Sequence, residues 1–179
     1  METFKLNVAG ITRELPICKV NEKLDIAAFV MFGDVELTVE CARALAKIAP
    51  DHDIIITAEA KGIPLAYEMA KQLGENRYLI ARKVPKLYMR DPVSVMVKSI
   101  TTERVQQLYL DRDDMDFIKD KRVLIVDDVI STGESISAVE ALVNLAGGNI
   151  VGRMAVLAEG EAAKRGDITF LEPLPLFFK

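Results

Sequence analysis

Short apolar runs rich in β-branched residues alternate along this chain with segments of helical periodicity. The expected strands begin at Asp53, Arg77, Arg122 and Ile150, and the expected helices occupy residues 34–50, 62–74 and 134–147. Asp34 is expected to cap the first helix and Pro50 to stop it, while Gly74 and Gly147 end the other two. Such alternation, with strands apolar on both faces, predicts an α/β fold: a central, mainly parallel sheet with flanking helices.

The two ends and one internal segment depart from the alternation. Residues 1–33 are expected to form a small hood or flap, residues 34–160 the core, and residues 161–179 a C-terminal edge, all in a single domain. The apolar end FLEPLPLFF suggests a short strand and a buried contact. Between about residues 82 and 115, the runs VSVMVKSI and VQQLYLD predict a mobile β-ribbon that carries basic residues.

Composition excludes several classes of protein. The net charge of −4 gives no overall basic field for nucleic acid. One histidine, and two cysteines without metal-ligand spacing, argue against a zinc site. There is neither a signal-peptide pattern nor an apolar run of about 18 residues. We therefore expect a cytoplasmic protein that binds neither nucleic acid nor membrane.

The stretch VLIVDDVISTGES, residues 123–135, contains the candidate ligand-binding residues. It reads as a buried strand that ends in two adjacent acids, followed by a turn that leads directly into a helix. In open α/β sheets, ligands bind beyond the carboxyl ends of the strands, and a helix N-terminus offers free N–H groups to an anion. Asp127 and Asp128 supply acceptors for sugar hydroxyls or a hydrated cation, while the turn suits a phosphate. The stretch indicates a ribose phosphate ligand.

Other phosphate-binding motifs fit poorly. The string GxxxxGK[ST] of a P-loop and the GxGxxG of a dinucleotide-binding fold are both absent. A phospho-acceptor receiver domain would need a further aspartate and a lysine on later strands, in only about fifty remaining residues. A structural explanation, an aspartate that caps a strand end, accounts for one acid but not for two followed by STG.

Residues 123–135 resemble the phosphoribosyl pyrophosphate (PRPP) signature of type I phosphoribosyltransferases. TAEAKGIPLA, residues 57–66, is similar to the pyrophosphate loop of the adenine phosphoribosyltransferase branch, and Arg82-Lys83 matches the basic pair that opens its mobile loop. The resemblance runs from about residue 53 to 160. It implies the type I phosphoribosyltransferase fold and transfer of the phosphoribosyl group of PRPP to a purine base, with release of pyrophosphate and with Mg²⁺ as cofactor.

The resemblance also implies roles for individual residues. Asp127 and Asp128 would hold the ribose, and Mg²⁺ would be held mainly by PRPP, with no direct protein ligand. The 5′-phosphate would lie in the turn formed by Ser131, Thr132, Gly133, Glu134 and Ser135. The pyrophosphate would be bound by Ala60, Lys61, Gly62, Arg82, Lys83 and Lys86, with Lys83 also in a catalytic role. The base pocket would include Leu15, Ile17 and Phe29, and the family's common state implies a homodimer. In the plainer alternative, Lys61, Arg82 and Lys83 are solvated surface charges.

The sequence departs from the family pattern at three places. Glu103 is the acid nearest to the catalytic glutamate of the adenine branch, but Thr101 or Thr102 aligns better, so a catalytic Glu103 is a weak prediction. Glu134 stands where many relatives have glycine. Glu159 follows the last core strand, where the xanthine branch has a lysine, which favours a base with an amino group. Adenine is the predicted base; the alternatives are a xanthine- or hypoxanthine-specific enzyme and a PRPP-sensing regulator on the same fold.

Overall fold

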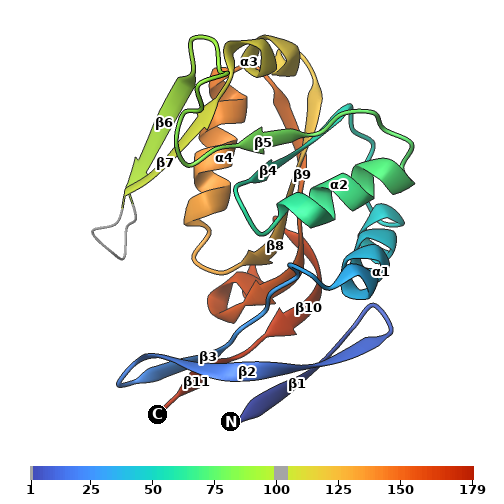
Figure 1. Ribbon diagram of the computed structural model, residues 1–179, viewed down its shortest axis with the longest axis vertical. Helices are drawn as coiled ribbons and strands as arrows, with labels where there is room; N and C mark the ends of the chain where they lie inside the picture. The colour runs from blue at the N-terminus through green and yellow to red at the C-terminus, as the bar shows by residue number, and fades with distance from the viewer. Residues whose placement is uncertain (1, 99–104) are drawn as a thin grey trace.

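The centre of the protein is a five-stranded sheet in which all strands are parallel (Figure 1). The computed structural model describes residues 2–98 and 105–179. The strand order is β10-β9-β8-β4-β5. These strands are β4 (Ile54–Ala58), β5 (Leu79–Ala81), β8 (Arg122–Ile130), β9 (Asn149–Glu159) and β10 (Thr169–Leu174). The predicted parallel sheet is therefore confirmed, and its strands are apolar because helices or the ribbon cover both faces.

Each face of the sheet has its own apolar core. Helices α1 (Val35–Ala46) and α2 (Ile63–Gln72) pack on one face, together with residues from the N-terminal strands. On the other face lie α4 (Glu134–Leu145), the short α3 (Arg112–Ile118) and the antiparallel ribbon of β6 (Val93–Lys98) and β7 (Val105–Leu110). No helix in the described ranges is long and apolar enough to cross a membrane.

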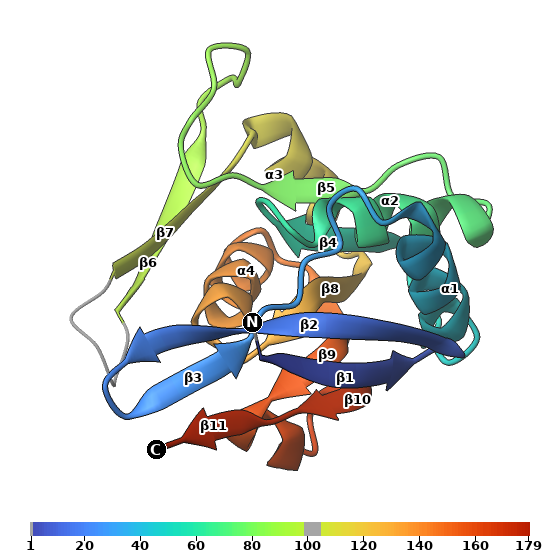
Figure 2. The same ribbon diagram turned by 60° about the horizontal axis from the view of Figure 1, so that its bottom comes forward.

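A second, antiparallel sheet lies at one end of the molecule and is called the hood here (Figure 2). It consists of β1 (Thr3–Val8), β2 (Ile11–Asn21), β3 (Leu24–Ala27) and the C-terminal β11 (Leu176–Phe178), in that order. The predicted hood is confirmed, with both ends of the chain in it. The apolar C-terminal tail finds its contacts within this chain, because Leu174 is buried and Phe177 packs edge-on against Phe4.

Local sequence signals explain where the helices begin and end. The Asp34 carboxylate accepts the backbone N–H of Leu37 at 3.0 Å, the expected N-cap of α1. Gly74 and Gly147 have φ of +75° and +76° just beyond α2 and α4, a conformation that glycine adopts without steric cost. Helix α1 ends at Ala46, before the expected stop at Pro50.

Two elements differ from the prediction. Helix α3 was expected to be part of the ribbon, but the Asp111 side chain accepts the N–H of Asp113 and starts a short helix there. Strand β8 continues to Ile130, because Val129 and Ile130 still pair with the long strand β9. The acid pair of residues 127–128, expected at the very end of the strand, therefore lies two residues before its end.

Candidate active site

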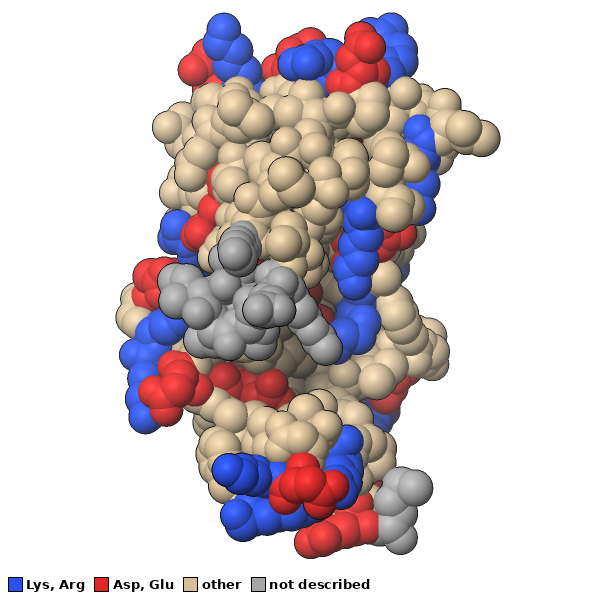
Figure 3. Space-filling model, turned by 90° about the vertical axis from the view of Figure 1, so that its left-hand side faces the viewer, with Lys and Arg blue, Asp and Glu red and all other residues tan. Residues whose placement is uncertain are grey.

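A cavity of about 550 Å³ lies between the carboxyl edge of the parallel sheet and the hood. Figure 3 shows the molecule hollowed on this side, with acidic and basic side chains around the hollow. Four groups of residues line the cavity: the acids at the end of β8 with the turn before α4, the end of β4 and its loop with Lys83, the hood-side segment, and the ends of β9 and β10. They are Asp127–Val129, Ser131 and Ser135; Ala58–Lys61 and Lys83; Ile26–Val30; and Glu159 and Leu174.

The two adjacent aspartates have different environments. Asp128 is buried, and its Oδ2 lies 3.1 Å from Nζ of Lys61. Asp127 is half-buried, and its Oδ1 accepts the backbone N–H of Asp128 at 2.8 Å. Burial, and then repulsion by the Asp128 carboxylate, raise the pKa of Asp127 above its usual range. The pair thus offers acceptor oxygens to the cavity, with one cation at its edge.

The loop after β4 lies close to this acid pair. Its Glu59–Ala60 peptide bond is cis, and Gly62 begins the approach to α2. A Cβ atom on Gly62 would overlap the Thr57 hydroxyl and lie 3.0 Å from Oδ1 of Asp127. Only glycine allows the backbone to come this near to the acids. The structure therefore brings the predicted Ala60, Lys61 and Gly62 together with Asp127 and Asp128.

Glu59 interacts with three basic residues that follow β5. Its carboxylate accepts the backbone N–H of Lys83 at 2.9 Å and lies 3.4 Å from Nε of Arg82 and 3.8 Å from Nζ of Lys86. The Lys83 hydrogen bond, and to a lesser degree the three cations, lower the pKa of Glu59. Lys83 lines the cavity, whereas Arg82 and Lys86 point to Glu59. The sequence does not predict this anchoring role, although Glu59 lies within the predicted loop of residues 57–66.

The turn before α4 encloses a small second hollow of about 40 Å³, lined by Asp127 and residues 129–136. Gly133 has φ +82° and no capping side chain, so the first N–H groups of α4 have no side-chain acceptor from that position. Behind the turn, the Arg165 guanidinium lies 2.8 Å from where a Cβ of Gly133 would be, held there by a bidentate pair with Asp167. All five predicted residues, Ser131 to Ser135, line this hollow.

The hood side of the cavity only partly follows the prediction. Phe29 is buried and lines it. Leu15 and Ile17 lie elsewhere, in the apolar core between the hood and α1. The wall is formed instead by residues 26–30 and by Leu174 and Glu159, at the ends of β10 and β9. The rule that ligands bind at carboxyl ends of strands would have favoured Glu159. Glu103 lies outside the described residues.

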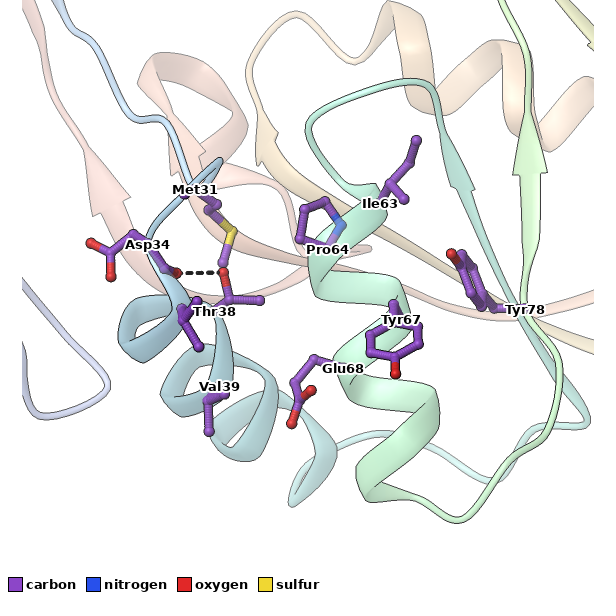
Figure 4. A pocket seen from close by; sticks show the side chains of 11 residues that line it. Met31, Asp34, Thr38, Val39, Ile63, Pro64, Tyr67, Glu68 and Tyr78 are labelled. Carbon is purple, nitrogen blue, oxygen red and sulfur yellow. Dashed lines mark hydrogen bonds between the residues drawn. The ribbon is translucent and has the colours of Figure 1, made fainter.

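Another cavity, of about 320 Å³, lies between α1 and α2 (Figure 4). Three of its polar side chains are already paired. The Thr38 hydroxyl donates to the Asp34 carbonyl at 2.8 Å, and the Asp34 carboxylate accepts from Arg13. Glu68 accepts from Gln72 and Lys71. With both of its carboxylates paired in this way, this cavity offers less chemistry than the one at the sheet edge.

Comparisons with known proteins agree on one family. The sequence profile of the phosphoribosyl transferase domain matches residues 35–172. A xanthine phosphoribosyltransferase of Brevibacillus brevis is 30% identical over 136 residues, which cover 74% of this chain and 68% of the relative. An adenine phosphoribosyltransferase of Thermotoga petrophila is 34% identical over 123 residues, covering 69% and 64%. The chain thus spans about two thirds of the length of these relatives.

The fold leads to the same family. The crystal structure of adenine phosphoribosyltransferase from Thermoanaerobacter pseudethanolicus superposes with a TM-score of 0.65 at 26% identity, covering 78% of this chain and 82% of that one. The two relatives from Brevibacillus brevis and Thermotoga petrophila are named for different purines, xanthine and adenine.

Proposed function

Because the chain belongs to the phosphoribosyl transferase domain family, we propose that it transfers the phosphoribosyl group of PRPP to a purine base, with adenine as that base. The products are the nucleoside 5′-monophosphate and pyrophosphate, and the role is purine salvage.

One observation carries this proposal: a single cavity joins an acid pair, a glycine-containing loop with a lysine, and a helix-starting turn. The turn suits the 5′-phosphate, since backbone N–H groups and the dipole of α4 favour an anion there. With the 5′-phosphate in the turn, the attached ribose would place its hydroxyls beside Asp127 and Asp128. The pyrophosphate group would then lie near Lys61 and Lys83.

In the proposed reaction the protein positions the substrates and stabilises charge, and it forms no covalent bond with them. A purine nitrogen forms a bond to C1 of the ribose as the bond from C1 to pyrophosphate breaks, so negative charge grows on the leaving oxygen. The proton of the purine's imidazole ring is released to water or to the departing pyrophosphate. Lys61 and Lys83 stabilise that charge best if water is excluded from the cavity. Asp127 and Asp128 fix the ribose so that C1 faces the base, and such positioning is a large part of catalysis.

A Mg²⁺ ion fits this site as a companion of the diphosphate. Mg²⁺ is usually held by one or two carboxylates together with substrate phosphates and waters. In this proposal PRPP itself holds most of the ion, and Asp127 and Asp128 line the same cavity beside the diphosphate. Within the described residues, no group of three or more acidic, histidine or cysteine side chains is placed to hold a metal alone. Bound there, the ion would neutralise diphosphate charge.

We further infer a cytoplasmic homodimer. The two free thiols, Cys18 and Cys41, suit a reducing compartment. The homodimer rests on the family resemblance, and light scattering of the full chain tests it directly.

The deciding experiment incubates the protein with Mg²⁺, PRPP and each purine base in turn and follows pyrophosphate release. Release with adenine supports the proposal as stated, and release only with xanthine or hypoxanthine moves it to that specificity. Tight PRPP binding by calorimetry without turnover on any base would refute the enzyme and favour a PRPP-sensing regulator.

A further inference from the structure

Arg13 is a charged residue in a row of apolar residues on the inner face of the hood. Alternate residues of a strand share one face, so Arg13 lies in the same row of β2 as Ile11, Leu15 and Ile17. Those three residues pack into the core between the hood and α1. The residue opposite Arg13 on β1 is Leu6, which is also buried. A charge at such a position is costly unless it is paired, so its partners indicate its role.

The Arg13 side chain is bound to the start of α1, beside which the β1–β2 hairpin lies (Figures 1 and 2). Its Nε and Nη2 donate to the two carboxylate oxygens of Asp34 at 2.7 and 3.1 Å, and Nη2 also donates to Glu36 at 2.8 Å. The side chains of Arg13 and Asp34 are 30% and 28% exposed, so water screens this pair less than a pair on the open surface. The hydrogen bonds from Arg13 lower the pKa of Asp34, which keeps its carboxylate charged at neutral pH.

This ion pair holds one end of the chain segment that forms the hood side of the cavity. Residues 26–30, called the hood-side wall here, line the large cavity and lead from β3 towards Asp34 and α1. At the β3 end, the N–H of Ala28 donates to the carbonyl of Pro16 on β2 at 2.9 Å. At the α1 end, Asp34 is bound by Arg13, which also belongs to β2. Strand β2 therefore holds this segment at two points.

Between the two points the segment depends on a few side-chain contacts. Residues 28–31 belong to neither a helix nor a strand, so no ladder of backbone hydrogen bonds fixes them. Phe29 and Met31 are buried in the core, whereas Val30 and Phe32, which alternate with them, are about half exposed. A segment of this kind moves easily if one of its attachments is lost.

We propose that Arg13 is a positioning residue for the base side of the cavity: it fixes the start of α1 against β2 and so sets where the hood-side wall lies. The inference rests on the proposed phosphoribosyl transfer, in which the base lies at this wall. Arg13 is outside the cavity lining and acts through the wall. Its loss should therefore affect the base and leave the phosphate-binding turn before α4 as it is.

The first test is Arg13→Ala, with steady-state kinetics for each substrate. We expect the KM for the purine base to rise about tenfold, because a displaced wall no longer matches the base, while the KM for PRPP stays within about twofold of the wild type. Arg13→Lys keeps the charge but lacks the planar fork that binds two carboxylates at once. Its KM for the base should lie between those of the wild type and Arg13→Ala.

Arg122→Ala is the matched control. Arg122 also binds an aspartate, Asp53, through Nε and Nη2 at 3.3 and 2.9 Å, but at the opposite edge of the sheet, where β4 and β8 begin. Its loss removes an ion pair of the same kind, as melting curves can show, and should leave both KM values unchanged. Asp34→Asn retains a helix cap and removes the charge. Combined with Arg13→Ala, it should add little to the rise in KM, since both changes remove one contact.

Hydrogen exchange gives a readout that needs no activity. In Arg13→Ala the amides of Ala28 and Asp34 should exchange faster, while those of β8 keep their wild-type rates. Wild-type exchange at both amides, a wild-type KM for the base, or equal rises in KM for base and PRPP would overturn the proposal. If Arg13→Ala does not fold, Arg13→Lys and Asp34→Asn serve the same measurements. If the wild type releases pyrophosphate with no base, phosphoribosyl transfer is wrong and the effect on the base falls with it, whereas exchange still decides whether Arg13 holds the wall.

Discussion

Gly62→Ala should damage both stability and activity through a single added methyl group. The backbone of Gly62 has φ −73° and ψ −12°, which alanine adopts readily. The conformation therefore carries no penalty, and the contact decides the outcome. The new Cβ would overlap the hydroxyl of Thr57, a fully buried residue near the end of β4, and would press on Oδ1 of Asp127 at 3.0 Å.

The magnitude follows from how little these neighbours can yield. Overpacking by one methyl group in a rigid environment costs about 1–3 kcal/mol. For a chain of this size, that lowers Tm by several degrees, since about 1 kcal/mol corresponds to roughly 2–4 °C. A shift of the loop by about 1 Å would also displace Lys61 and Asp127, and such a misplacement can reduce kcat/KM by about a hundredfold.

Calorimetric melting and pyrophosphate-release kinetics measure the two effects. Gly166→Ala is the control, because a Cβ at Gly166 meets nothing within 4 Å and should change stability by less than about 0.5 kcal/mol. Combining Gly62→Ala with Thr57→Ala removes the overlapping hydroxyl, so the two changes should relieve each other by about 1 kcal/mol in a double-mutant cycle. Wild-type Tm and kcat/KM in Gly62→Ala would refute the close approach of loop and acids.

Three further outcomes are expected. Asp128→Asn and Lys61→Ala should each lower kcat/KM about tenfold or more, and wild-type rates in both would mean that the ligand binds elsewhere. The folded protein holds the Asp127 proton more tightly than the unfolded chain, so this group makes the free energy of unfolding fall as pH rises above about 4, until it ionises in the folded state. Asp127→Asn should flatten that part of the urea-unfolding pH profile, and an unaltered profile would contradict the raised pKa. Glu59→Gln weakens the acceptor of the Lys83 amide, which should then exchange its hydrogen faster, and unchanged exchange would argue against the anchoring role.

The sequence could predict the parallel sheet because each of its features is local. The β-branched runs, the capping aspartate at residue 34 and the C-terminal glycines at residues 74 and 147 act within a few residues of one another. The loops of the site could be predicted for the same reason, since the acid pair and the turn after it form one continuous stretch of sequence. Strand β8 was expected to end too early, because its last residues are held by pairing with β9, a contact between distant segments.

The base side of the cavity was harder to predict for a related reason. Alternation along β2 does not reveal which face of the hood meets the core and which meets the cavity, and Leu15 and Ile17 pack into the core. Residues 26–30 line the cavity through a segment without regular periodicity. Helix α3 was missed because its seven residues are too few for a helical period to stand out beside the strands before it.

The arrangement of strands at the carboxyl edge of the parallel sheet explains why the acids of this site differ in their partners. Parallel strands bring their carboxyl ends to one side, so acids at or near the ends of β4, β8 and β9 converge there despite their mutual repulsion. Glu59 is matched by the cations after β5, and Asp128 by Lys61. No side chain in the described ranges forms an ion pair or hydrogen bond with the Glu159 carboxylate. Residues 26–30 of the hood side line the same cavity. The two matched acids organise the protein itself, whereas the Glu159 carboxylate stays open to the solvent of the cavity.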